Sequence, residues 1–287
     1  MAFVHAIVLG IIQGVAELFP ISSAAHTLLL SYLFGWQLPS LPFVVMLHLG
    51  TFLAVLVYFA RDYARLITGL FSGFGHRFRQ PFERLALLVI AGSIPLALVG
   101  KAFEKYFDKL FAWPLFAAGF LLVTGLVLFA VERLRQGQGR AEQLGLGQGV
   151  LVGLSQVGGL VPGGSRSGFS IAAGMLAGLT REEAARFSFL LAGPAIVGAS
   201  LFEMRRVLHP RDTGVEQHAI ALVGVAPEPL AVIVTGTVVA FVAGLIAIRF
   251  FMRYVDQHRL TPFAVYCWLF GLFNIVVIAL RHGQASP

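Results

Sequence analysis

The sequence predicts an all-α polytopic membrane protein with six transmembrane helices and two re-entrant helix–loop–helix hairpins, arranged as an inverted-topology repeat. Composition, the length of the apolar segments and a repeated break motif support this fold class. Of the 287 residues, 57% are hydrophobic and 12% are charged, and the mean hydropathy is +0.83. Soluble domains carry about 25% charged residues, so a soluble globular class is excluded.

The apolar segments are long and continuous. Six of them are predicted to cross the bilayer: residues 43–60, 85–100, 113–131, 187–202, 230–248 and 262–280. A transmembrane helix needs about 20 mostly apolar residues, whereas a transmembrane β-strand alternates apolar and polar residues. The continuous runs therefore favour membrane-spanning helices over a β-barrel.

Two further apolar regions, residues 4–34 and 145–179, are interrupted near the middle by proline, small residues and polar residues. Pro20 is expected to break the first and Pro162 the second, because proline removes a helical hydrogen bond and clashes with the preceding turn. Non-helical backbone at membrane depth is tolerated only where protein or a water-filled cavity covers it. Both regions are therefore predicted to be re-entrant hairpins that enter and leave the membrane on one side.

The order of hairpin, three spans, hairpin and three spans indicates an internal duplication. The chain is interpreted as a single integral membrane domain in two halves: residues 1–287, with half one about 1–140 and half two about 141–287. Pro20 aligns with Pro162 at an offset of 142 residues, which places Ser23 opposite Ser165. An odd number of spans in each half inverts the second half relative to the first. The two hairpins are then expected to meet near the bilayer midplane.

Basic residues between the apolar segments predict the orientation. Thirteen arginines, Arg135 among them, fall on one side of the membrane, and seven basic residues fall on the other: Lys101, Lys105, Lys109, Arg205, Arg206, Arg211 and Arg281. Cytoplasmic loops carry an excess of Lys and Arg, so the arginine-rich side is predicted to be cytoplasmic and both termini extracytoplasmic. This distribution explains the net charge of +7, so membrane lipid and not nucleic acid is the expected partner.

The first hairpin carries several chemically active side chains in the stretch Q-G-V-A-E-L-F-P-I-S-S-A-A-H. Gln13 and Glu17 are four residues apart, so they share one helical face. Ser22, Ser23 and His26 follow the break. A carboxylate in a membrane helix is costly, so a protected polar cavity is expected around Glu17. These residues can provide a base or cation ligand, a nucleophile, and a proton donor or acceptor.

The second hairpin carries V-P-G-G-S-R-S-G, which is typical of an anion-binding turn. Gly163 and Gly164 leave backbone N–H groups unobstructed, and a helix that starts near Ser167 presents its N-terminal amides to an anion. Ser165 precedes Arg166, whose planar guanidinium matches a phosphate or a carboxylate. We therefore expect an oxyanion cradle in this hairpin.

The two hairpins together allow two functions. An oxyanion cradle that faces a carboxylate, a hydroxyl and an imidazole suits phosphoryl transfer from a lipid-linked phosphate. The same arrangement suits a transporter of an anionic substrate, and the residue pattern alone leaves both open. His48 lies inside a predicted span and is interpreted as a satisfied core residue.

The two stretches resemble the motifs of the undecaprenyl-diphosphatase family (UppP, also called BacA). The first family motif is [E/Q]-x-x-x-E followed by proline, paired serines and histidine, and Gln13 and Glu17 match its first and last positions. The second motif is P-G-x-S-R-S, which the stretch from Pro162 to Ser167 matches. Length, hydropathy and the spacing between the motifs agree along the whole chain.

The resemblance implies a membrane phosphatase that hydrolyses undecaprenyl diphosphate to undecaprenyl phosphate and phosphate, which recycles the lipid carrier for cell-wall synthesis. It also implies a polyprenyl diphosphate lipid as substrate, dependence on a divalent cation (Mg²⁺ or Ca²⁺), and bacitracin resistance on overproduction. The expected location is the bacterial inner (plasma) membrane, with the active site facing the periplasm. A homodimer is allowed, and a transporter or flippase of a prenyl-phosphate lipid is the alternative.

The resemblance also assigns roles to individual residues. The implied catalytic residues are Glu17, Ser23, His26 and Arg166. The implied substrate-binding residues are Ser22, Gly163, Gly164, Ser165, Ser167 and Ser170, and the implied cation ligands are Glu17 and Gln13. On physical grounds we favour Ser23 as nucleophile, activated by Glu17 and assisted by His26, and a phosphohistidine at His26 is the competing scheme.

Three departures from the family pattern stand out. Gln13 replaces an acid that is common there, Ala24 and Ala25 replace a threonine–glycine pair, and Ser170 replaces a threonine. Gln13 removes one carboxylate from the first helix, so the departures affect the expected metal stoichiometry more than the expected reaction.

Overall fold

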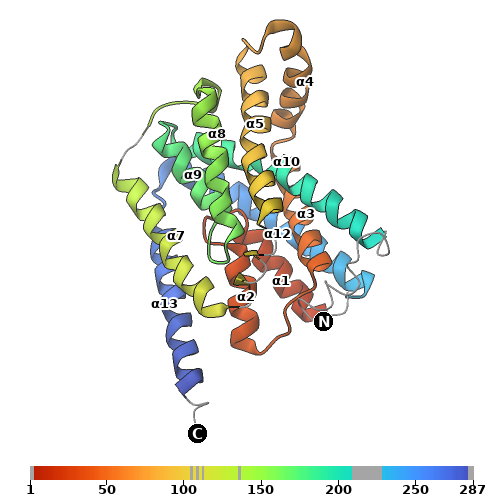
Figure 1. Ribbon diagram of the computed structural model, residues 1–287, viewed down its shortest axis with the longest axis vertical. Helices are drawn as coiled ribbons and strands as arrows, with labels where there is room; N and C mark the ends of the chain where they lie inside the picture. Colours follow the sequence, from red (N-terminus) through yellow and green to blue (C-terminus); the bar gives the residue numbers. More distant parts are fainter. Residues whose placement is uncertain are drawn as a thin grey trace.

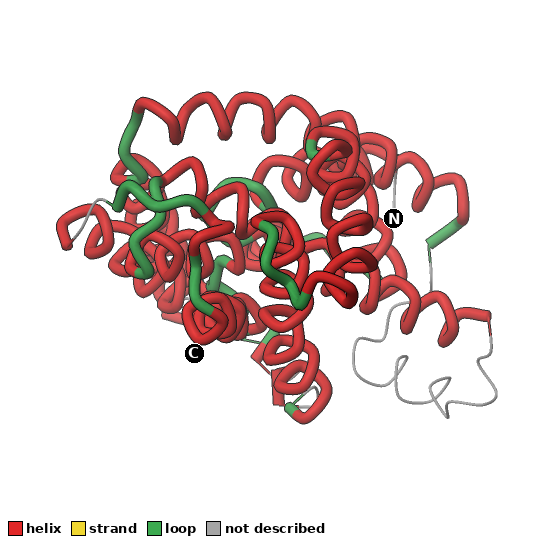
Figure 2. The backbone as a smooth tube through the Cα atoms, turned by 90° about the horizontal axis from the view of Figure 1, so that it is seen from above, coloured by secondary structure: helices red, strands yellow, loops and turns green. Residues whose placement is uncertain are grey.

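The computed structural model describes residues 3–103, 106–107, 110–111, 113–134, 137–208 and 228–283, with the side chains of 199–208 and 282–283 left out. The α-helices are α1 (Phe3–Ala16), α2 (Ser23–Phe34), α3 (Leu41–Tyr58), α4 (Ala60–His76), α5 (Pro81–Ala102), α7 (Pro114–Leu134), α8 (Leu146–Ser155), α9 (Arg166–Leu176), α10 (Arg181–Leu208), α12 (Leu230–Gln257) and α13 (Thr261–Gly283). Two short 3₁₀ helices are η1 (Ala141–Gln143) and η2 (Gln156–Leu160). Figures 1 and 2 show these helices joined by turns and loops. Some of the basic residues used to predict the orientation lie outside the described residues: Lys105, Lys109, Arg135 and Arg211.

In the described part of the chain, five helices are long and apolar enough to cross a membrane: α3, α5, α7, α12 and α13, of 18 to 28 residues. A hydrocarbon core of about 30 Å needs about 20 helical residues, so each of them suffices. They contain five of the six predicted spans and confirm a helical integral membrane protein. The sixth predicted span, residues 187–202, lies within α10, which is not among these five.

Helix α12 has one side buried in the protein and one exposed apolar side. Its side toward the protein carries small buried residues, Gly236, Ala240 and Gly244. Its outer side exposes Val238 and Ile246 by 54% and 65%. An apolar outer surface is stable in lipid and would be costly in water, so this helix has the residue distribution of a membrane span.

The first hairpin is broken where Pro20 predicted a break. Helix α1 ends at Ala16 and α2 begins at Ser23. Ser22 caps α2, and its side-chain oxygen accepts a hydrogen bond from the Ala25 N–H at 3.3 Å. Ser22 has a φ of 68°, which residues other than glycine rarely adopt. The cap and this backbone conformation turn the chain from α1 into α2.

The second hairpin is broken in the same way between η2 and α9. Pro162 precedes Gly163, whose φ of 96° requires glycine. The Gly163 carbonyl accepts a hydrogen bond from Thr124 Oγ1 on α7 at 2.7 Å. Ser165 caps α9 by accepting from the Gly168 N–H at 3.1 Å. Both predicted helix breaks are therefore confirmed.

Close glycine contacts fix each hairpin against a long helix. On α1, a Cβ at Gly10 or Gly14 would overlap backbone atoms of α12, at Gly236 and Ala240 respectively. On α8, a Cβ at Gly153 would overlap the Gly92 backbone on α5. Helix α1 thus packs on α12, and α8 packs on α5.

Buried apolar side chains complete this arrangement. The largest cluster joins α5, α7, α9, α10 and α12. A second cluster places Ala25 and Leu29 of α2 against Leu121 of α7 and Cys267 of α13. Both hairpins consequently pack against the longer helices, while Ile11 of α1 and Leu151 of α8 are exposed.

Helix α4 is an element that hydropathy did not predict. Leu66, Gly69 and Gly73 are buried, whereas Phe71 and Phe74 are 73% and 75% exposed. Its polar residues recur between the apolar ones, so no continuous apolar run marks it. Figure 1 shows the α4–α5 hairpin projecting from one end of the bundle, away from the end that α13 reaches.

Candidate active site

A buried carboxylate lies where the two broken hairpins meet. Glu17 follows α1 directly and is 9% exposed. Its Oε2 accepts a hydrogen bond from Ser23 Oγ at 2.7 Å and one from Gln13 Nε2 at 3.1 Å. The break after Glu17 brings the Ser23 hydroxyl back onto the carboxylate, although the two residues belong to different helical segments. The predicted grouping of these three residues is correct.

The second hairpin contributes the guanidinium of Arg166, the first residue of α9. Arg166 Nη2 lies 2.8 Å from Glu17 Oε1, so the two hairpins are joined by an ion pair. Arg166 Nη1 is buried and has no hydrogen-bond partner within the described part of the chain. A buried N–H group without a partner is costly. This nitrogen is therefore the natural donor for an oxygen of an anionic ligand.

His48 of α3 is a further member of the cluster. Its Nε2 lies 3.3 Å from Glu17 Oε2, and its Nδ1 lies 2.9 Å from the Val44 carbonyl oxygen. The Val44 carbonyl can only accept, so Nδ1 carries a hydrogen, and Nε2 lies at ion-pair distance from the Glu17 carboxylate. When His48 is protonated, the cluster with Arg166 has one positive charge more than Glu17 neutralises, which favours an anion.

The interpretation of His48 as a core residue was wrong. Its side chain is 31% exposed, against 14% for Arg166 and 9% for Glu17. A single histidine in an apolar span gives no signal that distinguishes a core residue from a site residue. Only the packing of α3 beside the first hairpin brings His48 to Glu17.

The remaining serines and glycines of the second hairpin build its framework. Ser167 Oγ donates to the carbonyl oxygens of Glu17 and Phe19, each at 3.3 Å, and so holds the first hairpin against the second. Ser165 caps α9, and Ser170 Oγ lies 2.6 Å from Ser188 Oγ on α10. Of the predicted substrate-binding residues, Gly163 faces α7 through its carbonyl, and the Gly164 N–H donates within the turn, to the Val161 carbonyl at 2.8 Å. None of these side chains contacts the Glu17 carboxylate.

His26 lies apart from the carboxylate cluster. Its Nδ1 is 2.7 Å from the Ser22 carbonyl oxygen, and its Nε2 is 2.7 Å from the Tyr266 hydroxyl on α13. The imidazole stacks on Phe270 with ring centroids 4.7 Å apart. The structure therefore brings Gln13, Glu17, Ser23 and Arg166 together by direct contacts, and it connects His26 to them only through the backbone at Ser22.

The side chains around Glu17 do not fit a divalent cation held by the protein. Mg²⁺ prefers about six oxygen ligands and Ca²⁺ about six to eight. Glu17 already faces four donors, from Gln13, Ser23, His48 and Arg166. Among the described residues, no three His, Cys, Asp or Glu side chains are grouped as ligands. The cation dependence that the family resemblance implies stays a prediction.

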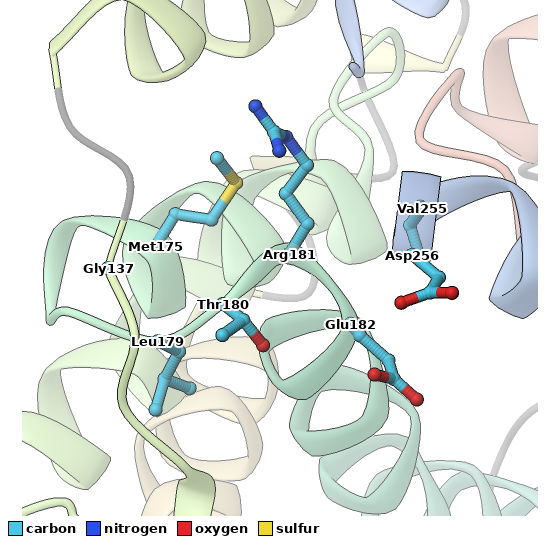
Figure 3. Close-up of a pocket in the computed structure, with 8 residues that line it drawn as sticks. All are labelled: Gly137, Met175, Leu179, Thr180, Arg181, Glu182, Val255 and Asp256. Carbon is cyan, nitrogen blue, oxygen red and sulfur yellow. The ribbon is translucent and has the colours of Figure 1, made fainter. Parts of the chain in front are cut away.

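A separate polar pocket of about 250 Å³ lies elsewhere in the structure (Figure 3). It is lined by Gly137, Met175, Leu179, Thr180, Arg181, Glu182, Val255 and Asp256. The guanidinium of Arg181 is bonded to both carboxylate oxygens of Glu132, at 2.8 and 2.7 Å. Because that charge is already neutralised and no predicted site residue lines the pocket, we do not assign the active site there.

Fold and site together define a helical integral membrane protein in which two broken hairpins join a carboxylate, a hydroxyl and a guanidinium in one buried cluster. Residues 6–273 match the family model described as bacitracin resistance protein BacA. This chain belongs to the BacA family.

Named relatives agree with this assignment along almost the whole chain. The chain is 38% identical over 315 residues to the undecaprenyl-diphosphatase of Mycolicibacterium paratuberculosis (strain ATCC BAA-968 / K-10), which covers 98% of this chain and 99% of that protein. It is 40% identical over 280 residues to the undecaprenyl-diphosphatase of Pelobacter propionicus, with 97% and 98% covered. It is 36% identical over 282 residues to the undecaprenyl-diphosphatase of Methanobrevibacter smithii, with 95% and 96% covered.

Proposed function

We propose that this protein hydrolyses undecaprenyl diphosphate to undecaprenyl phosphate and inorganic phosphate, which recycles the lipid carrier for cell-wall synthesis. The observation that carries the proposal is the contact between Ser23 Oγ and Glu17 Oε2 at 2.7 Å, with Arg166 on the other oxygen of the same carboxylate. Phosphoryl transfer needs a nucleophile with a base beside it and a donor to the phosphoryl oxygens, and a hydroxyl, a carboxylate and a guanidinium can supply these. Membership of a family whose named relatives are diphosphatases supports the same reaction over transport.

In the first step, Ser23 Oγ bonds to the terminal phosphorus while the bond from that phosphorus to the bridging oxygen breaks. The Ser23 proton passes to Glu17, and undecaprenyl phosphate leaves with the bridging oxygen. Arg166 Nη1, which has no partner within the described chain, donates to a phosphoryl oxygen as charge develops there.

In the second step, water attacks the phosphoserine. Glu17 has by then released its proton to the solvent, and it takes a proton from the water as the new bond to phosphorus forms. The bond between phosphorus and Ser23 Oγ breaks, and Oγ recovers a proton from Glu17. Inorganic phosphate leaves and the site returns to its starting state.

The hydrogen bonds of His26 favour Ser23 as the nucleophile. The Ser22 carbonyl can only accept, so His26 Nδ1 carries the hydrogen. His26 Nε2 then accepts from the Tyr266 hydroxyl, and its lone pair is occupied. A phosphohistidine would need this lone pair, whereas the Ser23 hydroxyl already lies on its base.

We further propose that α10 is the sixth membrane span and that the two broken hairpins are re-entrant. The glycine contacts support two inverted halves of one domain, because α1 packs on α12 and α8 packs on α5, so that each hairpin meets a helix of the other half. The distribution of basic residues supports cytoplasmic placement of the arginine-rich side. We place the protein in the bacterial inner membrane with its site open to the periplasm.

The function is tested by incubating the purified protein in detergent with undecaprenyl diphosphate, with and without a chelator. We expect inorganic phosphate and undecaprenyl phosphate in equal amounts. The chelator arm tests the predicted dependence on Mg²⁺ or Ca²⁺ separately. A folded preparation that leaves the diphosphate intact would contradict the proposed function, and transfer of intact lipid across liposomes would then indicate a flippase.

His48→Ala is expected to lower turnover by about 10- to 100-fold, which corresponds to the loss of one hydrogen bond to a charged group. The change removes the imidazole that lies 3.3 Å from Glu17 Oε2. The measurement is phosphate release at saturating substrate. His258→Ala is the matched control, because His258 is exposed and bonds to the backbone of α12. Equal rates for the two variants would show that His48 plays no part in the reaction.

A further inference from the structure

The residue just before the proposed nucleophile is held in an unusual backbone conformation. Ser22 has a φ of 68° and is 2% exposed. A positive φ in a residue other than glycine is unfavourable and persists only where the surroundings enforce it. The orientation of Ser22 determines where the Ser23 hydroxyl points, because the two residues share a peptide bond. A contact that holds the backbone of Ser22 therefore also directs the Ser23 hydroxyl toward Glu17.

His26 provides that contact through one ring nitrogen. The Ser22 carbonyl accepts two hydrogen bonds from His26, one from its backbone N–H at 3.2 Å and one from Nδ1 at 2.7 Å. The second bond is the shorter and comes from a side chain that is 5% exposed. The imidazole therefore fixes the carbonyl of the residue before the nucleophile.

The orientation of His26 is in turn fixed by α13. The Ser22 carbonyl can only accept, so the hydrogen of the neutral ring is on Nδ1 and the Tyr266 hydroxyl donates to Nε2, at 2.7 Å. The ring is also parallel to those of Tyr266 and Phe270, with interplanar angles of 5° and 9°. The hydroxyl holds Nε2 and the stacked rings oppose turning of the imidazole, so Nδ1 stays on the Ser22 carbonyl.

We propose that Tyr266 is a positioning residue: by donating to Nε2, it holds the His26 ring with its Nδ1–H on the Ser22 carbonyl and so aims the Ser23 hydroxyl at Glu17. His26 then also acts by positioning, through Nδ1, and its Nε2 does not contact the reacting phosphate. This inference rests on the proposed phosphatase function and deepens the role of two residues of the same site.

The activity test uses variants that each preserve one nitrogen position of the imidazole. In His26→Asn, the side-chain amide can replace Nδ1 as donor to the Ser22 carbonyl, whereas in His26→Gln the amide corresponds to Nε2. We expect His26→Asn to retain turnover within about tenfold of wild type, the scale of one weakened hydrogen bond. We expect His26→Gln to lose about 100-fold, the scale of a displaced reacting group. Equal losses in the two variants would overturn the proposal, because a chemical role of Nε2 predicts that result.

Tyr266→Phe is expected to lower turnover by about tenfold in the wild-type background, since it removes one hydroxyl and keeps the stacked ring. In the His26→Asn background it should have no further effect, because Nε2 is then absent. A further tenfold loss in that background would show that Tyr266 acts independently of His26. Phe270→Leu is a control for loss of stacking without loss of the hydroxyl.

A spectroscopic measurement tests the tautomer without reference to activity. In protein with ¹⁵N-labelled histidine, the His26 signals are those that disappear in His26→Asn. We expect them to report hydrogen on Nδ1 and an unprotonated, hydrogen-bonded Nε2 in wild type, and loss of the Nε2 hydrogen-bond shift in Tyr266→Phe. Hydrogen on Nε2 in wild type would overturn the proposal, whether or not the protein hydrolyses undecaprenyl diphosphate.

Discussion

Glu17→Gln is expected to lower turnover by about 10⁴-fold, the scale seen when a residue of a cooperating catalytic group is removed. Glutamine keeps the size of the side chain and one carbonyl oxygen. It cannot take the proton of Ser23, and it leaves Arg166 and His48 without their negative partner. The measurement is phosphate release under single-turnover conditions, so that the chemical step is observed directly.

Gln13→Ala is the matched control for this change. Gln13 donates to the same Glu17 oxygen that Ser23 does, at 3.1 Å, but it carries no proton to transfer and no charge. We expect a loss of about tenfold or less from removing one neutral donor. Thermal unfolding and size-exclusion chromatography in detergent establish that both variants are folded. Turnover of folded Glu17→Gln within threefold of wild type would exclude Glu17 as the base.

Arg166→Ala is the second large effect, with an expected loss of about 10³-fold in turnover, the scale of removing a guanidinium from a phosphoryl-transfer site. The change removes Nη2 from Glu17 and Nη1 from the position that we assign to a phosphoryl oxygen. Arg166→Lys keeps the charge and loses the planar fork, so it should recover only part of the rate. Phosphate release at saturating substrate measures both variants.

Arg253→Ala is the control for loss of one arginine from the membrane protein. Arg253 lies on α12 and is exposed, so its removal should leave turnover near the wild-type value. If Arg166→Ala is folded and retains more than a tenth of wild-type turnover, Arg166 does not stabilise the transferred phosphoryl group.

The helix breaks and the pairing of the two hairpins were predictable from local chemistry. Pro20 and Pro162 cannot continue a helix, and the structure ends α1 and η2 within a few residues of them. The repeat spacing placed the two motifs opposite each other, and the ion pair between Glu17 and Arg166 joins them in the structure. These features depend on residues whose backbone preferences are strong.

The contacts of the two histidines were not predictable in the same way. His48 reaches Glu17 because α3 packs beside the first hairpin, and nothing in the residues around His48 specifies that packing. His26 follows the paired serines and was expected beside the carboxylate, but its ring turns toward Tyr266 on α13, 240 residues later. Which side of a helix faces which neighbour is determined by the packing of the whole bundle.

The role of Ser165 also became clear only with the helix boundary. The sequence places it in a glycine-rich turn, where a serine can bind an anion or cap a helix. Helix α9 begins at Arg166, so the Ser165 hydroxyl caps the Gly168 N–H. Whether Ser165 binds an anion or caps the helix depends on the exact first residue of α9. Sequence patterns do not predict helix ends to within one residue.

Hydrolysis in water enriched in ¹⁸O tests the central claim most directly, because it identifies the phosphorus that receives the water oxygen. Attack by Ser23 on the terminal phosphorus, followed by water, places the label in inorganic phosphate and leaves undecaprenyl phosphate unlabelled. Mass spectrometry of both products after a single turnover measures the distribution. We predict one labelled oxygen in inorganic phosphate and none in the lipid, and label in undecaprenyl phosphate would contradict the proposed reaction.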